Sequence, residues 1–186
     1  MRIQIEENIG KIEGLTLIIP EIIRDNKGTF METFNGQALN SVGLSSKFVQ
    51  DNQVFNIGSV LRGLHVNINN PQAKLIRVLN GSIFDVVVDL RKSSSTYTKW
   101  YGVELNSENR KQLYIPEGFA HGYYVQSNTA EVLFKVTTHW VPNDEIGIAW
   151  DSKELGIQWP LKDRTKPIMN EKDANNKSFV DIFGKR

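Results

Sequence analysis

The chain is a succession of short strand-like runs separated by turns, and this pattern limits its possible folds more than any other feature. Thr29–Phe34 alternates polar and apolar residues, which is the period of a half-buried strand. Asn80-Gly81 stands between two apolar runs, and an Asn-Gly pair in that setting predicts a β-hairpin. The runs recur at a spacing of roughly ten residues, which is typical of an all-β sandwich or barrel.

We therefore predict an all-β fold with few helices. One short helix is expected at Gly36–Asn40 and another after Asn170. The expected strands are Leu15–Pro20, Thr29–Phe34, Phe48–Phe55, Ala73–Leu79, Ile83–Leu90, Trp100–Leu105, Lys111–Ile115, Gly122–Val125 and Val132–Val136.

The composition is that of a globular protein. Its 186 residues, with 40% hydrophobic and 23% charged, suit one domain spanning residues 1–186. A net charge of +1 gives no reason to expect nucleic-acid binding, and the absence of cysteine excludes disulfides and thiolate catalysis. No apolar run approaches the ~18–20 residues of a membrane helix. We expect a cytoplasmic protein with no membrane partner, whose polar stretch from about Leu161 to Arg186 wraps the surface or a partner subunit.

Two of the three histidines stand in runs that could carry chemistry. His65 ends Val60-Leu61-Arg62-Gly63-Leu64-His65, and His121 lies in Gly118-Phe119-Ala120-His121-Gly122. Histidine titrates near neutrality, so either residue is a candidate proton-transfer base. With Lys74, these side chains would supply what is needed to remove a proton next to a carbonyl. A lone inward histidine is nevertheless often only a hydrogen-bonded core residue.

The same three residues do not predict a metal site. The run after His65 is Val66-Asn67, which lacks a second imidazole, and the ammonium of Lys74 would repel a cation. Taken alone, Lys74 reads as a solvated strand lysine, whereas inside a barrel its ammonium could stabilise an oxyanion.

The neighbouring sequence gives three acidic residues no catalytic or binding role. Asp85 and Asp89 alternate with valines, so both should face the same side of one strand as structural hydrogen-bond acceptors. Asp173, in Asn170-Glu171-Lys172-Asp173, reads as a surface acid.

Several longer motifs occur in a fixed order along the chain. They are Phe48-Val49-Gln50-Asp51-Asn52, Val60-Leu61-Arg62-Gly63-Leu64-His65, Gln72-Ala73-Lys74-Leu75, Gly118-Phe119-Ala120-His121-Gly122, Gly147-Ile148-Ala149-Trp150, Gly156-Ile157-Gln158-Trp159-Pro160 and Lys172-Asp173. From about Gly14 to Asp173 the chain resembles the dTDP-4-dehydrorhamnose 3,5-epimerase family. The resemblance implies a cupin-type jelly-roll β-barrel, a homodimer, and no metal or organic cofactor.

The resemblance also implies a role for individual residues. The family inverts C3 and C5 of a 4-keto-6-deoxy sugar linked to a nucleoside diphosphate, in deoxysugar (dTDP-L-rhamnose) biosynthesis. His65 would be the base, with Asp173 as the carboxylate that orients it, and Lys74 and His121 would face the keto group. The substrate-binding positions implied in this way are Lys27, Glu32, Gln50, Asn52, Arg62, Glu145 and Lys172, with Arg62 as a diphosphate ligand and Glu32 reaching a neighbouring subunit's site.

The chain departs from the family pattern at the position of the second proton-transfer group. The family has a tyrosine acid in a Tyr-Lys-X-Thr run, and this chain has Phe134-Lys135-Val136-Thr137. Tyr123, Tyr124 or a water could supply the proton instead, or only C3 or only C5 is inverted on a related sugar, or the protein binds a nucleotide sugar without catalysis. Lys27 also replaces an arginine of the family, which keeps the charge but loses a bidentate phosphate contact.

Overall fold

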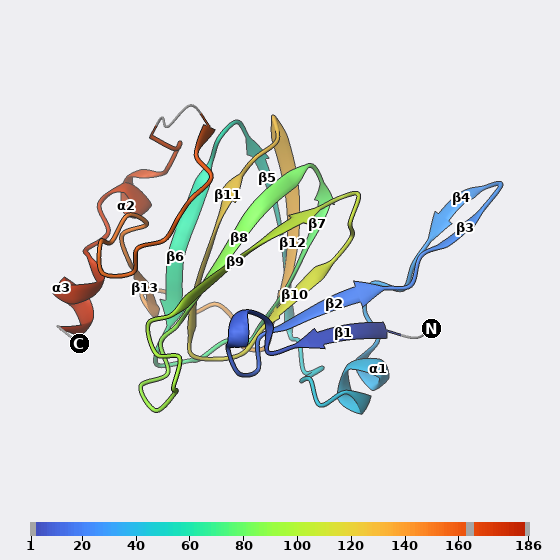
Figure 1. The fold of residues 1–186 in the computed structure, drawn as a ribbon, viewed down its shortest axis with the longest axis horizontal. Helices are drawn as coiled ribbons and strands as arrows, with labels where there is room; N and C mark the ends of the chain where they lie inside the picture. The colour runs from blue at the N-terminus through green and yellow to red at the C-terminus, as the bar shows by residue number, and fades with distance from the viewer. Residues whose placement is uncertain (1–2, 163–165, 185–186) are drawn as a thin grey trace.

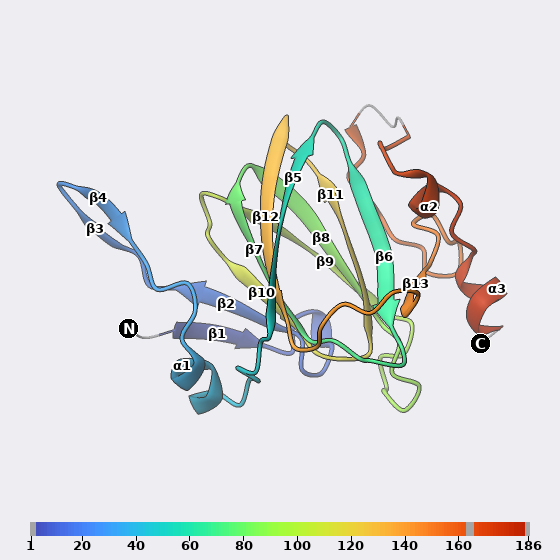
Figure 2. The same cartoon turned by 180° about the vertical axis from the view of Figure 1, so that it is seen from behind.

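Two antiparallel sheets packed face to face form the body of the protein (Figures 1 and 2). The computed structural model describes residues 3–162 and 166–184. The six-stranded sheet has the order β1 (Ile3–Glu7), β2 (Thr16–Pro20), β10 (Gln112–Ile115), β7 (Lys74–Asn80), β12 (Thr129–Val136) and β5 (Gln50–Ile57). The five-stranded sheet has the order β13 (Glu145–Gly147), β6 (Leu61–Asn67), β11 (Phe119–Val125), β8 (Ser82–Asp89) and β9 (Trp100–Asn106). The predicted all-β jelly-roll fold is confirmed.

The chain passes from one sheet to the other at most of its turns. β5 is followed by β6, β7 by β8, and β11 by β12, and the members of each pair lie in different sheets. The hairpin predicted at Asn80-Gly81 is therefore wrong: this turn joins β7 to β8 at a corner between the sheets. Gly81 suits the corner because its φ is +80°, and because a Cβ there would stand 2.1 Å from the carbonyl oxygen of Thr129.

Alternation along the strands separates the interior from the outer faces. On β8, Val87 belongs to the cluster between the sheets, whereas Val86 and Val88 belong to a second cluster on the outer face of the five-stranded sheet. A third cluster lies outside the six-stranded sheet and includes Leu75 of β7. Because side chains alternate along a strand, the neighbours of Leu75 point inward, and one of them is Lys74.

Short helices cover the outer faces. α1 (Gly36–Ser41) contributes Leu39 to the cluster outside the six-stranded sheet, as expected for the predicted helix. α2 (Glu171–Ala174) and α3 (Phe179–Phe183) lie beside the five-stranded sheet, and Phe179 packs into its outer cluster. The predicted path of the last stretch over the surface is thus seen for 166–184, while 163–165 and 185–186 lie outside the described residues. A single-turn 3₁₀ helix, Ile9–Lys11, follows β1.

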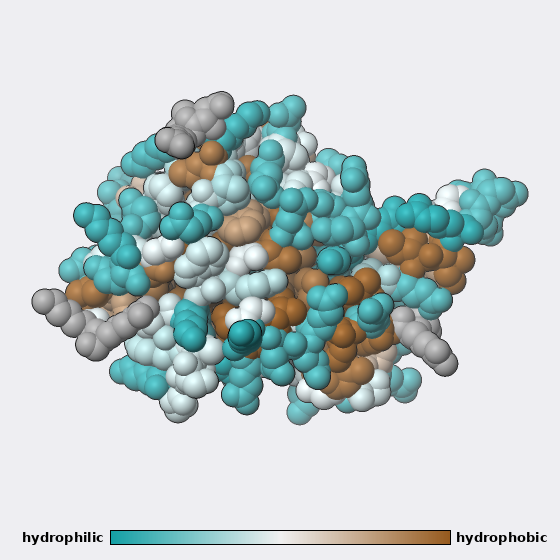
Figure 3. Space-filling model, in the orientation of Figure 1, coloured by the Kyte–Doolittle hydropathy of each residue, from teal (hydrophilic) through white to brown (hydrophobic). Residues whose placement is uncertain are grey.

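A two-stranded hairpin extends away from the body. It consists of β3 (Ile23–Asp25) and β4 (Gly28–Phe30), and all of its residues are exposed. The strand predicted at Thr29–Phe34 is therefore shorter than expected and not half-buried, because within residues 3–162 and 166–184 this hairpin pairs only with itself. Figure 3 shows a hydrophilic tip on this arm and hydrophobic surface beside its base. Among the described residues, no helix is long and apolar enough to span a membrane.

Candidate active site

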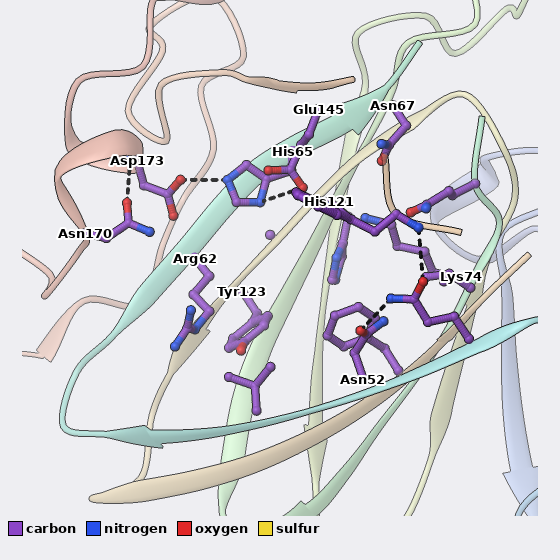
Figure 4. A pocket seen from close by; sticks show the side chains of 17 residues that line it. Asn52, Arg62, His65, Asn67, Lys74, His121, Tyr123, Glu145, Asn170 and Asp173 are labelled. Atoms are coloured by element: carbon purple, nitrogen blue, oxygen red, sulfur yellow. Dashed lines mark hydrogen bonds and ion pairs between the residues drawn. The ribbon is translucent and has the colours of Figure 1, made fainter. Parts of the chain in front are cut away.

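A cavity of about 230 Å³ opens between the two sheets. Residues from both sheets line it, together with two from the segment around α2 (Figure 4). The predicted site residues that the structure brings to this cavity are Gln50, Asn52, Arg62, His65, Lys74, His121, Phe134, Glu145 and Asp173. The other lining residues are Val54, Asn67, Gln72, Gly122, Tyr123, Val136, Trp140 and Asn170.

His65 of β6 is held between two carboxylates. Its Nε2 lies 2.6 Å from Oδ1 of Asp173, and its Nδ1 lies 3.7 Å from Oε2 of Glu145 (Figure 4). A carboxylate accepts hydrogen bonds, so the short contact places the proton of the neutral imidazole on Nε2. The lone pair is then on Nδ1, and this nitrogen is the one available to act as a base.

Asp173 is buried, with 2% of its surface exposed, so its reading as a surface acid from the local sequence is wrong. The preceding segment runs beside β6, because the backbone of Ile168 bonds to Ser59 and Leu61. Asn170 then caps α2 by accepting a hydrogen bond from the Asp173 amide at 2.7 Å. This path brings the carboxylate to His65 across 108 residues of sequence.

The ionised form of Asp173 is favoured by its contacts. Burial alone would raise its pKa, but hydrogen bonds from His65 and from the Gly63 amide hold the pKa of Asp173 below its ordinary value. The carboxylate therefore stays charged at neutral pH and stabilises an imidazolium on His65.

Glu145 and Lys172 form a pair at the edge of the cavity. β13 lies next to β6, so Glu145 stands opposite Asn67 in the sheet. The ammonium of Lys172 lies 3.0 Å from Oε1 of Glu145. Lys172 is not among the residues that line the cavity, and it contacts the site through this carboxylate.

A second histidine–carboxylate pair lies beside the first. His121 of β11 is the register partner of His65, and its Nε2 lies 2.9–3.0 Å from both oxygens of Asp85 on β8. Asp85 is fully buried, and it orients the ring of His121 toward the cavity. Sequence reasoning gave Asp85 no such role. A buried carboxylate needs a partner, but the sequence does not name one that is 36 residues away.

A bulge between β6 and β11 allows Arg62 and His65 to face the same cavity. His121 pairs with His65, whereas Tyr123 pairs with Arg62, so the single residue between the pairs on β11 opposes two residues on β6. Gly63 makes this close approach possible, because a Cβ there would stand 2.6 Å from the backbone of His121 and Gly122. A regular strand would have pointed Arg62 away from His65.

We call the side of the cavity formed by the six-stranded sheet the facing wall. Its residues are Gln50, Asn52 and Val54 of β5, Lys74 of β7, and Phe134 and Val136 of β12. Burial lowers the pKa of Lys74, while the negative charges of Glu145 and Asp85 act in the opposite direction. Lys74 is only 8% exposed and so brings a poorly hydrated cation into the cavity.

Two predicted substrate contacts lie away from the cavity within one chain. Lys27 is at the tip of the β3–β4 hairpin, where its ammonium lies 3.4 Å from Asp25. Glu32 follows that hairpin, and one of its carboxylate oxygens is buried without a hydrogen-bond partner. Tyr124, a candidate proton donor, also points elsewhere, and its hydroxyl accepts a hydrogen bond from the Lys162 amide.

This arrangement can move a proton at a carbon atom. It has a base with an oriented lone pair, a second oriented imidazole, and a buried cation on the facing wall. Within 3–162 and 166–184 no cluster of three or more histidine or acidic side chains is placed to hold a metal ion.

The fold and the site together define a jelly-roll protein whose cavity carries the groups for proton transfer at a carbon atom. A family model described as dTDP-4-dehydrorhamnose 3,5-epimerase matches residues 10–181. The chain belongs to this family.

Individual relatives agree with the family model. The dTDP-4-dehydrorhamnose 3,5-epimerase of Methanothermobacter thermautotrophicus is 48% identical over 164 residues, covering 88% of this chain and 89% of the relative. The crystal structure of a dTDP-6-deoxy-D-glucose-3,5-epimerase from Legionella pneumophila, in complex with dTDP-4-keto-L-rhamnose, has a TM-score of 0.89 at 39% identity, covering 95% and 93% of the two chains. That of the Elizabethkingia anophelis dTDP-4-dehydrorhamnose 3,5-epimerase has a TM-score of 0.91 at 36% identity, covering 97% and 98%.

Proposed function

We propose that this chain is a dTDP-4-dehydrorhamnose 3,5-epimerase that acts in deoxysugar (dTDP-L-rhamnose) biosynthesis without a metal or organic cofactor. It inverts C3 and C5 of dTDP-4-keto-6-deoxyglucose by removing and returning protons next to the 4-keto group. The observation that carries the proposal is the short contact between His65 and buried Asp173, with Lys74 across the same cavity.

The chemistry begins with proton abstraction by His65. Its Nδ1 takes the proton from the carbon next to the ketone, and the imidazolium that forms lies between the carboxylates of Asp173 and Glu145. The negative charge passes to the keto oxygen, where the ammonium of Lys74 stabilises it. The Nε2 proton of His121 is held by Asp85, so His121 donates to this oxygen from Nδ1 as an imidazolium. Because the interior is poorly hydrated, these charges act more strongly there than they would in water.

The nucleotide is expected to lie over the mouth of the cavity. About 230 Å³ is less than the roughly 300–1,000 Å³ of typical small-molecule pockets, so the sugar fills the cavity and the diphosphate and base extend beyond it. Arg62 supplies a forked cation for the diphosphate. Trp140, 61% exposed at the rim, offers an aromatic face to a base, and Gln50 holds its backbone through a 3.0 Å hydrogen bond.

The proposal includes a homodimer. The β3–β4 arm exposes Ile23 and Phe30, and its two strands pair with each other and with no further strand among the described residues. A second copy would cover these apolar side chains, and it would bring Lys27 and Glu32 to a cavity that they do not reach within one chain. The single-domain organisation and the cytoplasmic location stay predictions from the sequence.

The configuration of the product tests the proposal. Purified protein is incubated with dTDP-4-keto-6-deoxyglucose, the product is trapped by reduction, and the configurations at C3 and C5 are read by proton NMR. The proposal expects both centres to be inverted. Inversion of C3 alone or C5 alone would support a single-centre epimerase, for which Phe134 is the reason, and no inversion would contradict the proposal.

A further inference from the structure

Inversion at a carbon requires proton transfer on two opposite faces of the substrate. A base removes the proton from one face, and an acid must return a proton to the other face. If only His65 acts, it returns the proton to the face from which it took it, and the configuration is retained. The donor must therefore reach the side of the sugar opposite His65.

The facing wall holds few groups that could act in this way. Among its described residues, Gln50 and Asn52 carry amides, and Val54, Phe134 and Val136 carry no acidic proton. Lys74 is the acid on this wall, and the mechanism above uses its charge at the keto oxygen. The proton donor must then come from another strand.

Tyr123 extends from the sheet of His65 toward the opposite sheet. Its Cα is in β11, in the same sheet as His65, but its hydroxyl lies 3.4 Å from Oδ1 of Asn56 on β5, a strand of the opposite sheet. Its ring lines the cavity, and Figure 4 shows the hydroxyl turned away from His65, beside Arg62. Among the described residues, Tyr123 is the only tyrosine that lines the cavity.

The surroundings of the hydroxyl fit a proton donor. Asn56 accepts a 2.9 Å hydrogen bond from Arg62 Nε, and its amide donates to the Ala130 carbonyl, so the oxygen that faces Tyr123 is fixed in place. The 3.4 Å contact from the hydroxyl is long for an O–H···O hydrogen bond and leaves the phenol free to turn toward a substrate. The guanidinium of Arg62 lies beside the phenol and can stabilise a phenolate.

We propose that the Tyr123 hydroxyl protonates the sugar carbon on the face opposite His65, in place of a donor at position 134. This inference rests on the proposed function. In the step, the phenol O–H bond breaks and a C–H bond forms at the carbon, while the enolate returns to the ketone and Tyr123 becomes a phenolate. Water then reprotonates the phenolate, and His65 releases to solvent the proton that it removed, so each turnover leaves the enzyme unchanged.

The protonation state of Tyr123 agrees with this role. Burial raises the pKa of Tyr123, while the charge of Arg62 and the hydrogen bond to Asn56 oppose the shift. The phenol is therefore fully protonated at neutral pH. A phenol is still a much stronger acid than the α-carbon of a ketone, so transfer of its proton to the enolate carbon is downhill.

The test separates proton exchange from inversion. Tyr123→Phe and the control Tyr124→Phe, which removes a buried hydroxyl that does not line the cavity, are incubated with dTDP-4-keto-6-deoxyglucose in D₂O. For each variant, NMR gives the rate at which deuterium enters at C3 and C5, and reductive trapping gives the rate of inversion. Thermal unfolding checks that both variants are folded.

For Tyr123→Phe we expect a rate of deuterium exchange within a few-fold of wild type. The rate of inversion should fall by about 10²–10⁴-fold, which is the usual contribution of general acid catalysis. Tyr124→Phe should invert at the wild-type rate. Adding Phe134→Tyr to the Tyr123→Phe variant should restore inversion, because it introduces a hydroxyl on the facing wall.

Two results would overturn the inference while leaving the proposed function intact. One is a Tyr123→Phe variant that inverts as fast as wild type, which would move the donor role to Lys74 or water. The other is a parallel fall in exchange and inversion in a folded variant, which would place the role of Tyr123 in proton abstraction and not in the return of the proton. If the wild-type protein neither exchanges nor inverts, the proposed function fails and this inference fails with it.

Discussion

Replacing Asp173 by asparagine removes the charge behind the base and changes little else in shape. The carboxylate is 2% exposed and makes a 2.6 Å contact with His65 Nε2. A hydrogen bond to a charged group contributes about 1.5–3 kcal/mol, which corresponds to about a 10- to 150-fold slower proton abstraction. A change in the tautomer of His65 slows proton abstraction further. Gly63 donates its amide proton to the other carboxylate oxygen, so the asparagine must turn its NH₂ group toward His65.

An NH₂ group facing Nε2 favours the tautomer with the proton on Nδ1, and that tautomer cannot act as the base. We therefore expect Asp173→Asn to lower the exchange rate at C3 and C5 at least tenfold, and toward the ~10⁴-fold known for a wrong tautomer in a serine protease triad. The assay is deuterium incorporation followed by NMR under single-turnover conditions. Asp151→Asn removes the same charge at an exposed position and should not change the rate. An Asp173→Asn rate within twofold of wild type would refute the reasoning.

Two further substitutions test other parts of the structure. Lys74→Met removes the cation at the keto oxygen and should lower kcat about 10²–10³-fold in steady-state kinetics, with a smaller change in KM, because the charge acts on the enolate; a change confined to KM would contradict this role. Asp89→Asn should lower the free energy of unfolding by about 2 kcal/mol at neutral pH, as measured by urea unfolding. Burial alone would raise the pKa of Asp89, but hydrogen bonds from Arg91, Ser94 and Thr96 outweigh it and hold this pKa at about 2 instead of 3.8. Because this pKa is lowered on folding, the stabilisation is present above pH 3.8 and is lost as the pH falls through 2. An equal loss of unfolding free energy at pH 2 and at pH 7 would contradict the stabilising role of the Asp89 carboxylate.

Local patterns in the sequence predicted most of the strands of the two sheets, but not β1, β6 or β13. Alternation along β5 places Gln50 and Asn52 on the inner side, and the same rule places Lys74 inside because Leu75 packs outside. The two-residue period of a strand agrees with these positions, but the resemblance to the family, and not the period, assigned the three residues to the site.

Features that depend on pairing between distant segments were not predicted from the residues alone. The Asn80-Gly81 turn has the composition of a hairpin, but which sheet receives β8 is decided by its pairing with β11 and β9. The burial of Asp173 depends on the bridge between Ile168 and Val60, and the link from Asp85 to His121 depends on the register of β8 with β11. The bulge that turns Arg62 toward the cavity is likewise a property of two strands together.

The role of His65 as the base is the central claim, and deuterium exchange in His65→Ala tests it most directly. Wild type and variant are compared with dTDP-4-keto-6-deoxyglucose in D₂O, with the H3 and H5 signals followed separately by NMR. The account predicts that both signals wash out with wild type, and that neither does with His65→Ala above the rate without enzyme. Exchange at the wild-type rate in a folded His65→Ala variant would contradict it.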